Sequence, residues 1–375
     1  MRVLHVINGL GASGAEIMLF NLAVRLREMG VEQEILTLMP GGSLVERFRA
    51  EGFMPTDVAM KQGIPSLAAL RSLRAHIRRS QADVILGWMY HSCWAASLAA
   101  PRGTPVVWGF HHTLTKLSSE RPLTRFLIQF GTVFKRSVSH YVYVSNTSAE
   151  QHFALGYPQL NSTVISNGFD MQRFVPDSSL REAVRAELGI PGNAVVFGAA
   201  ARFHPMKNQV GLVKAFVKAT AGHGNTVLVM AGRGVDTHNA DLVRAQQAET
   251  TGGRVLLLGE RSDMTRLMNA FDFYVSPSGW GESFPLVLGE AMASGVPCIT
   301  TDLGDCAYIV GDTGVVIPPG DDGALVDALC GALAMDLPAR AALGCAARRR
   351  IEERFSLDPV AERYLAVLRN AVARP

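Results

Sequence analysis

Two successive series of short apolar runs, separated by segments with helical spacing, constrain the fold of this 375-residue chain. The first series predicts buried strands at residues 3–7, 35–39, 84–88, 106–110 and 141–144. The second predicts strands at residues 195–199, 227–231, 255–258, 273–275, 298–301 and 315–317. Segments between them, such as Ala15–Met29 and Ser66–Arg79, carry apolar residues at helical spacing. The alternation predicts an α/β fold with two parallel sheets, each covered by helices on both faces.

The length of the chain also favours two domains, because 375 residues exceed what one hydrophobic core usually holds. The polar stretch Asp170–Ser179 is the predicted hinge, and it leads into a helix near Leu180–Leu188. We therefore expect one domain at residues 1–172 and a second at 173–356. Open parallel sheets bind ligands at the carboxyl ends of their strands, so two facing domains would share a cleft.

Composition excludes several classes of protein. A hydrophobic content of 48% with 18% charged residues is typical of a well-packed chain rather than a disordered one. The uncharged stretch Val84–Pro101 is broken by Gly87 and reads as a strand followed by a helix, not as a membrane span. The cysteines are odd in number, scattered and without a Cys-x-x-Cys pair: Cys93, Cys298, Cys306, Cys330 and Cys345. We expect no disulfide, no structural zinc, no signal peptide and a cytoplasmic location.

Two acidic residues eight positions apart, Glu282 and Glu290, form the most informative local pattern. Pro285 suits the first position of a helix, so a helix is predicted from Pro285 through Glu290 to about Ser294, ending at Gly295. Glu282 would lie in the loop before this helix and Glu290 about one turn inside it. An alternative is a loop glutamate and a helix glutamate with no shared role.

The backbone between these acids suits an anion. The free N–H groups of Ser283 and Phe284, with the positive end of the helix dipole, would point at a phosphate. Carboxylates on either side of a pyrophosphate could accept hydrogen bonds from hydroxyl groups at both ends of the ligand. A nucleotide sugar presents such hydroxyls, on a ribose at one end and a hexose at the other.

The segment Gly279–Pro297 resembles the Glu-x7-Glu signature of the retaining glycosyltransferases of family 4, which have the GT-B fold. The resemblance implies that Glu290 holds the donor ribose, that Glu282 contacts the donor sugar, and that Ser283, Phe284, Pro285 and Leu286 line the nucleotide-sugar site. It also implies two Rossmann-like domains facing across a cleft. The first would bind the acceptor and the second the nucleotide sugar, and a C-terminal helix within residues 357–375 would pack back on the first.

The first strand leads into Gly9-Leu-Gly11-Ala-Ser-Gly14, which satisfies Gly-x-Gly-x-x-Gly and raises the alternative of an NAD-dependent oxidoreductase. That alternative needs an acid at the end of the second strand, but Glu32 and Glu34 lie at its start. Gly14-Ala-Glu16 instead resembles the N-terminal Gly-Gly-Ala-Glu element of the glycosyltransferase family. The resemblance places Gly14 and Glu16 beside the donor pyrophosphate and the acceptor, whereas a plain strand-to-helix turn remains the other reading.

Arg202 and Lys207 follow the first strand of the second series. A departing nucleoside diphosphate develops negative charge that a metal or fixed cations must stabilise, and the sequence holds no Asp-x-Asp metal motif. A guanidinium and an ammonium at this junction can meet the diphosphate oxygens directly, so the chemistry is expected to need no metal and no other cofactor. The pair also resembles the Arg-x4-Lys pair of the family.

Three further positions carry weaker resemblances. His111 and His112 end the fifth strand, and the family has a histidine near here that contacts the donor sugar; His111 is the favoured candidate. Asn167 lies in a segment that resembles the one closing the first domain, and we expect it to take a left-handed turn. Arg261 lies in a loop that resembles the one holding the nucleotide base.

The reaction implied is transfer of a glycosyl unit from a nucleotide sugar, most simply a uridine-linked one, to a hydroxyl acceptor with retention. No second acid suits the nucleophile of a double displacement, so front-face attack assisted by the leaving group is expected. An inactive protein that only binds nucleotide sugars is a further alternative.

Basic residues are concentrated in residues 61–136, which hold 11 Lys and Arg but only Asp83 and Glu120 as acids. One group of arginines lies at helical spacing opposite leucines: Arg71, Arg74, Arg78 and Arg79. A second group brackets the apolar stretch Phe126–Phe134: Arg121, Arg125, Lys135 and Arg136. This pattern predicts peripheral contact with an anionic membrane at its cytoplasmic face, where the enzyme would extend a lipid-linked glycan or polysaccharide precursor. The alternative is helices that pack on the sheet and show their charge to water. Nucleic acid is not an expected partner, since the net charge is only +3.

Overall fold

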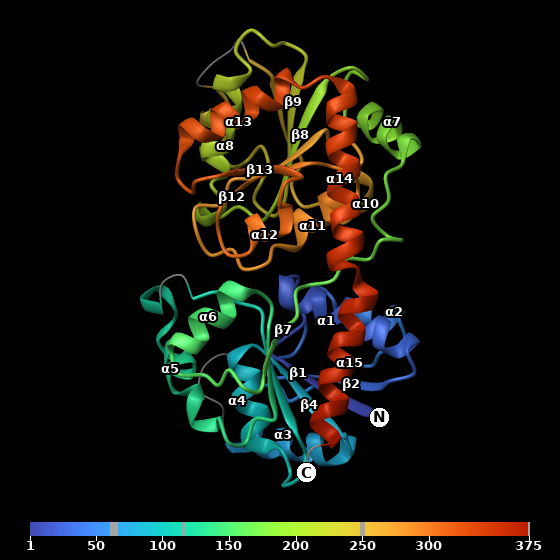
Figure 1. The fold of residues 1–375 in the computed structure, drawn as a ribbon, viewed down its shortest axis with the longest axis vertical. Coiled ribbons are helices and arrows are strands. Elements are labelled where there is room, and N and C mark those ends of the chain that lie inside the picture. The colour runs from blue at the N-terminus through green and yellow to red at the C-terminus, as the bar shows by residue number, and fades with distance from the viewer. Residues whose placement is uncertain (61–66, 115–116, 248–251, 374–375) are drawn as a thin grey trace. The chain divides into compact units, whose positions relative to one another are not determined.

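The computed structural model describes residues 1–60, 67–114, 117–247 and 252–373. The chain forms two compact units (Figure 1). Unit 1 comprises Met1–Gly168 and Leu357–Pro375, and unit 2 comprises Phe169–Ser356. The sequence placed the first boundary after residue 172, whereas the chain enters unit 2 at Phe169.

The predicted hinge, Asp170–Ser179, is a packed part of unit 2. Phe169 and Phe174, which flank its first residues, are both buried. The Arg348 guanidinium donates to the carbonyl oxygens of Phe174 (2.6 Å) and Met171 (3.2 Å). These contacts hold Met171 and Phe174 against a helix of unit 2, although most side chains between Gln172 and Ser179 are exposed.

The sheet of unit 1 has the order β3-β2-β1-β4-β5-β6-β7, and its strand pairs are all parallel. The strands are β1 (Arg2–Ile7), β2 (Glu32–Thr37), β3 (Thr56–Asp57), β4 (Val84–Trp88), β5 (Val106–Phe110), β6 (His140–Tyr143) and β7 (Ser162–Val164). Every residue of β4 and β5 is buried, which explains their continuous apolar sequences. The sequence missed β3 and β7 because they are short and carry no apolar run.

Helices cover both faces of this sheet (Figure 1). They are α1 (Gly14–Glu28), α2 (Val45–Ala50), α3 (Leu67–Ser80), α4 (Met89–Ala99), α5 (Pro122–Phe130), α6 (Asn146–Ala154) and α15 (Leu357–Ala373), with 3₁₀ turns η1 (Leu117–Ser119) and η2 (Gly131–Phe134). One core lies under α1, α2 and α15, and a second lies under α3, α4 and α5. The terminal helix α15 has the predicted bounds and packs on α1. Ser66, predicted to begin α3, lies outside the described residues.

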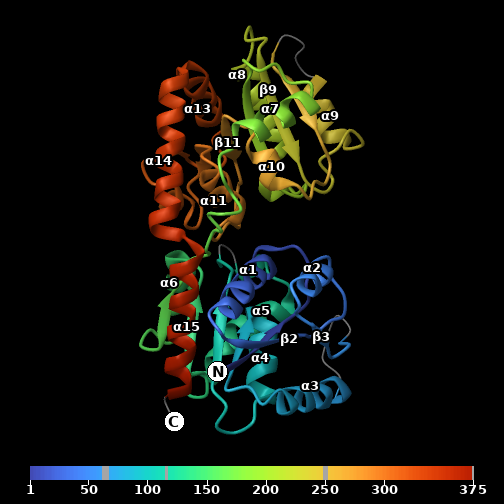
Figure 2. The same ribbon diagram turned by 90° about the vertical axis from the view of Figure 1, so that its right-hand side faces the viewer.

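The sheet of unit 2 has the order β10-β9-β8-β11-β12-β13, again with parallel pairs only. The strands are β8 (Val195–Ala200), β9 (Thr226–Ala231), β10 (Arg254–Leu257), β11 (Phe273–Ser276), β12 (Cys298–Thr301) and β13 (Gly314–Ile317). The helices are α7 (Ser178–Glu187), α8 (Gln209–Ala219), α9 (Ala240–Gln247), α10 (Met264–Met268), α11 (Leu286–Ala293), α12 (Cys306–Val310), α13 (Asp322–Ala334) and α14 (Leu337–Phe355), with the 3₁₀ turn η3 (Pro205–Lys207). Figure 2 shows the long α14 beside α11.

A buried ion-pair cluster ties α7 to the sheet of unit 2. Asp272, just before β11, accepts hydrogen bonds from Arg181 (2.5 Å) and Arg185 (2.8 Å). Asp177 caps the helix by accepting from the backbone N–H groups of Ser179 and Leu180. The helix begins two residues before the predicted start at Leu180.

Both units are doubly wound α/β folds of the Rossmann type. The strand order reverses between β1 and β4 in unit 1, and between β8 and β11 in unit 2. Such reversals open a crevice at the carboxyl ends of the strands, where these folds bind ligands. Within the described residues, no single helix is long and apolar enough to cross a bilayer; α13 and α14 meet that test only as a pair bent by 114°.

Candidate functional site

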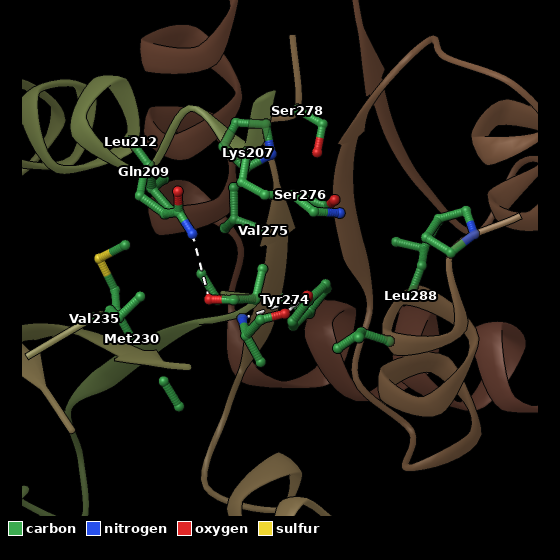
Figure 3. A pocket seen from close by; sticks show the side chains of 17 residues that line it. Lys207, Gln209, Leu212, Met230, Val235, Tyr274, Val275, Ser276, Ser278 and Leu288 are labelled. Carbon is green, nitrogen blue, oxygen red and sulfur yellow. Dashed lines mark hydrogen bonds between the residues drawn. The ribbon is translucent and has the colours of Figure 1, made fainter. Parts of the chain in front are cut away.

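A pocket lies at the strand-order reversal of unit 2, where β8, β9 and β11 end (Figure 3). Its walls include Ala199–Ala201 at the end of β8 and just after it, Met230 and Ala231 at the end of β9, and Tyr274–Ser278 from β11 and the two residues that follow it. Lys207 and Gln209 reach it from the loop after β8 and the start of α8, and Leu288 reaches it from α11. The pocket thus draws on three strand ends, on the β8–α8 connection and on α11.

The side chain of Gln209 bridges several backbone groups of the loop from β8 to α8. Its amide nitrogen donates to the carbonyl oxygens of Arg202 (2.9 Å) and Ala201 (3.3 Å), as Figure 3 shows for one of these bonds. Its amide oxygen accepts from the backbone N–H of His204 (3.3 Å). Asn208 adopts a left-handed conformation (φ 50°) between η3 and α8. This buried glutamine was missed by sequence reasoning, because its role depends on the loop folding back over it.

Lys207 and Glu282, 75 positions apart in the sequence, are in direct contact. The Lys207 Nζ lies 2.5 Å from Glu282 Oε1, and the Ser278 hydroxyl donates to the same oxygen at 2.5 Å. The side chain of Glu282 is only 7% exposed and that of Lys207 is 21% exposed. A buried carboxylate needs such partners, because an unpaired buried charge is costly. The structure therefore brings two predicted site residues together.

The loop that carries Glu282 is fixed by close backbone approaches. The N–H of Gly279 donates to the carbonyl oxygen of Met206 (2.8 Å). Gly281 has φ +76°, and a Cβ there would come within 2.5 Å of the Met206 sulfur. A Cβ at Gly304 would come within 2.4 Å of the Glu282 carbonyl oxygen. Glycine is thus required at Gly281, just before Glu282, and at Gly304, whose backbone packs against the Glu282 carbonyl.

Helix α11 begins one residue later than predicted. Pro285 has ψ 120°, which is extended, so it precedes the helix and Leu286 is the first helical residue. The helix ends at Ala293, followed by Ser294 and Gly295 (φ +75°), as the sequence indicated. Glu290 lies just over one turn inside the helix and is half-buried. Ser283 and Phe284 lie in the loop just before this helix, as predicted.

Arg202 and Arg261 differ in their surroundings. Arg202 is exposed and forms no ion pair within the described residues. Arg261 pairs with Asp263 (2.7 Å) and with Glu187 (3.0 Å). The hydrogen bond to Asp263 raises the pKa of the Arg261 guanidinium further above its ordinary value. Its guanidinium is thus held by two carboxylates, and Arg261 does not line the pocket.

The two histidines at the end of β5 in unit 1 have separate roles. The His111 ring stacks on Trp88, with ring centroids 4.9 Å apart, and its Nε2 lies 3.4 Å from the Tyr364 hydroxyl. Burial lowers the pKa of His111 to about 4, although a hydrogen bond to Asn167 opposes this, so the ring is neutral at neutral pH. His112 instead pairs through Nε2 with Glu120 (2.8 Å).

The glycine-containing loop after β1 leads directly into helix α1. Gly14 is exposed and is the first residue of α1. The Ser13 hydroxyl, at the N-cap position of α1, donates to the Glu16 carboxylate three residues on. Burial raises the pKa of Glu16. Gly14 and Glu16 thus stand at the carboxyl edge of the unit 1 sheet.

The predicted left-handed turn at Asn167 is wrong. The non-glycine residues with positive φ among the described residues are Ala59, Gln81, Met89 and Asn208. Asn167 is buried, and the chain runs on from it into a parallel bridge between Phe169 and Ser356, which favours an extended path. Within the described ranges no cluster of three or more His, Cys, Asp or Glu side chains could hold a metal ion.

Comparison with known proteins matches both halves of the chain. A family profile described as Glycosyltransferase Family 4 matches residues 12–173, and one described as Glycosyl transferases group 1 matches residues 194–335. The D-inositol 3-phosphate glycosyltransferase of Saccharomonospora viridis is 28% identical over 403 aligned positions, covering 96% of this chain and 90% of that protein.

A second relative and a solved structure agree with these matches. The UDP-Gal:alpha-D-GlcNAc-diphosphoundecaprenol alpha-1,3-galactosyltransferase of Escherichia coli is 25% identical over 256 residues, covering 67% of this chain and 66% of that protein. The crystal structure of Anabaena HepE in complex with UDP-glucose superposes with a TM-score of 0.84 at 20% identity, covering 98% of this chain and 99% of that one. The fold of the two units is therefore that of GT-B proteins.

Proposed function

Because this chain belongs to the glycosyltransferases of family 4, we propose that it transfers a sugar from a uridine-linked donor to a hydroxyl group, with retention at the anomeric carbon. The donor class is supported by HepE, which is named in complex with UDP-glucose. The proposed acceptor is a lipid-linked glycan or a related polysaccharide precursor. It is supported by the Escherichia coli relative, whose name includes a diphosphoundecaprenol-linked sugar.

The contact of Lys207 with Glu282 is the observation that carries this proposal. It lies at the strand-order reversal of unit 2, where a doubly wound sheet binds its ligand. When the bond from the sugar to the diphosphate breaks, negative charge grows on the diphosphate oxygens. Lys207 and Arg202, on one loop, supply two cations for those oxygens. We therefore expect no requirement for a divalent cation or another cofactor.

The acids flank the proposed diphosphate position. Glu290, on α11, would accept hydrogen bonds from the ribose hydroxyls, and Glu282 would accept one from the donor sugar. The backbone from Ser283 to Leu286 would face the phosphates at the positive end of α11, with Pro285 shaping the approach. Ser278 and Gln209 would act as positioning residues, because they hold Glu282 and the Lys207 loop.

The proposed reaction keeps the sugar configuration by attack on the face from which the diphosphate leaves. The acceptor oxygen bonds to the anomeric carbon as the bond to the diphosphate breaks, and a diphosphate oxygen takes the acceptor proton. Glu282 is a poor nucleophile for a double displacement, because its Oε1 is engaged by Lys207 and Ser278. In unit 1, His111, Asn167, Gly14 and Glu16 are our candidates for contacts to the sugar and the acceptor. The backbone around Arg261 is our candidate for the base.

A donor panel tests the proposal. UDP-linked and GDP-linked sugars would be assayed for nucleotide release, with and without undecaprenol-diphosphate-linked acceptors, and NMR would give the anomeric configuration of the product. We expect acceptor-dependent release from a UDP-sugar and a product with the donor's configuration. Release from no donor in the presence of any acceptor, with UDP still binding, would instead support the inactive binding protein.

The oxidoreductase alternative finds no support at the corresponding position of unit 1. Strand β2 ends at Thr37, a buried threonine, whereas that alternative needs an acidic residue at the end of this strand to hold a ribose. Glu32 lies at the other end of the strand and pairs with Arg2 (2.8 Å).

A further inference from the structure

Helix α5 and the following turn η2 expose an apolar strip on the surface of unit 1. Its four members are 36%, 47%, 49% and 65% exposed: Leu123, Phe126, Phe130 and Val133. Leu123, Phe126 and Phe130 stand three and four positions apart, so they share one helix face. Surface helices usually turn polar side chains to water, and a run of large exposed apolar side chains marks an interaction site.

The strip has a rigid base. Phe126 and Phe130 pack together with ring centroids 4.6 Å apart, and Phe126 also meets Trp94 at 6.1 Å. The Trp94 indole N–H donates to the carbonyl oxygen of Leu127 (3.0 Å). The opposite face of α5 is anchored by Leu127 and Ile128 in the core under the sheet. The strip is therefore held outward by a helix whose inner face is already packed.

Basic side chains surround the strip. They are Arg121, Arg125, Lys135 and Arg136, which are all exposed and form no ion pair within the described ranges. The neighbouring acid, Glu120, is hydrogen-bonded to His112. Exposed aromatic and aliphatic side chains bordered by cations are complementary to an anionic bilayer. Its acyl chains can receive the apolar side chains, and its negative headgroups attract the cations.

Helix α3, the other basic segment, does not offer such a surface. Its arginines are exposed, but Leu73 and Ile77 are buried in the core of unit 1. Leu73 and Ile77, two of the apolar residues that the sequence placed opposite the arginines, are therefore unavailable for a membrane contact in the folded unit. Leu67 is the one large apolar side chain of α3 that is largely exposed, so this helix presents a single leucine and not a strip. Figure 1 shows α5 on the other side of the unit 1 sheet from α15, consistent with its place in the second core.

We propose that the α5–η2 strip, with its four bordering cations, docks this protein on an anionic lipid bilayer by inserting Phe126 and Phe130 between headgroups. The proposal goes beyond the transfer reaction and does not depend on it. It would bring the enzyme to the surface that carries lipid-linked acceptors.

Vesicle sedimentation of the full chain tests this. We expect binding to vesicles that contain phosphatidylglycerol, weak binding to pure phosphatidylcholine, and release at high salt. Each cation near an anionic surface is worth roughly fivefold in binding. Arg121→Glu with Arg125→Glu should therefore weaken binding by about 20-fold or more. Phe126→Ser with Phe130→Ser should weaken binding to both types of vesicle.

The double substitution Arg74→Glu with Arg78→Glu on α3 is the matched control, because it makes the same charge change on a helix without an exposed apolar strip. This control should weaken vesicle binding clearly less than Arg121→Glu with Arg125→Glu does. Circular dichroism and UDP affinity would show that each variant is folded. Equal recovery in the supernatant with both vesicle types, or an equal loss from the α3 control, would overturn the proposal. So would a concentration-dependent dimer that Phe126→Ser with Phe130→Ser abolishes, since the strip would then serve a second copy of this chain.

Discussion

At the scale of single residues, the environment of Glu282 sets the chemistry that the site can perform. One of its oxygens is engaged by Lys207 and Ser278, whereas Glu290, eight positions later, lies on α11 and is half-buried. The two acids therefore differ: Glu282 is tied to the cationic loop, and Glu290 is carried by a helix. This difference supports separate roles at the sugar and at the ribose.

Glu290→Gln should weaken UDP and the sugar donor together. Loss of a charge-assisted hydrogen bond to the ribose costs about 1–3 kcal/mol, which calorimetry would measure as a lower affinity for both ligands. Glu353→Gln, an exposed position on α14, is the control and should leave both affinities unchanged. An unaltered affinity for free UDP in folded Glu290→Gln would remove the ribose role.

Lys207→Ala should lower kcat far more than it lowers donor affinity, because the charge that Lys207 meets develops as the diphosphate leaves. Activity of the unaltered enzyme should survive a strong chelator. Lys214→Ala, on the exposed face of α8, is the matched control. Activity that disappears in the chelator and returns with magnesium or manganese would contradict the metal-free reaction.

At the scale of elements, α11 is positioned by a glycine that its neighbours require. Gly289 precedes Glu290, and a Cβ there would come within 2.1 Å of the buried Phe169 ring. Helix propensity alone would favour alanine at this position by about 1 kcal/mol. The close approach to Phe169 must therefore outweigh propensity, and it sets how near α11 lies to the start of unit 2.

Gly289→Ala should destabilise unit 2 by about 1–3 kcal/mol, because the ring and the new methyl group cannot both fit. Gly331→Ala, in the exposed part of α13 with no atom within 4 Å of its Cβ, should instead stabilise by about 0.5–1 kcal/mol. Denaturant unfolding of both variants measures the difference. Equal stabilisation by both substitutions would show that Phe169 moves aside without cost.

At the scale of the whole molecule, the two units differ in their buried titratable groups. His5 and His152 of unit 1 are fully buried, and burial lowers the pKa of each to about 4; that of His111 falls similarly. His5 is held between Gln33 and Trp88. The histidines of unit 2 lie in loops, where none is buried.

Unit 1 should therefore lose stability first as the solution is acidified. Because the folded pKa lies below the unfolded value of about 6.5, the unfolded chain binds more protons between these values. The stabilising contribution is complete above pH 6.5 and is lost as the pH falls toward 4. The slope approaches about 1.4 kcal/mol per pH unit for each buried histidine. Hydrogen exchange, corrected for intrinsic rates, should show β1 and α6 losing protection before β8 and β9. Parallel losses in both units would contradict this.

The sequence by itself determined the elements and the identity of the family. Its apolar runs located β4, β5 and β12 to the residue, since fully buried parallel strands are continuous in sequence. Pro285 at the start and Gly295 at the end located α11 to within one residue, because turn and cap residues act locally. Short polar strands such as β3 could not be found, since pairing with a neighbour, not composition, defines them.

Only the tertiary structure decided which distant residues meet. The contact of Lys207 with Glu282 depends on β8 and β11 being neighbours in the sheet, and the role of Gln209 depends on a loop folding back over it. The boundary at Phe169 follows from where that ring is buried, although the surrounding sequence is polar. The two basic helices α3 and α5 have similar patterns, yet packing buries the apolar face of one and leaves a strip of the other exposed. Burial is a property of the assembled fold, because it depends on what the rest of the chain places against each face.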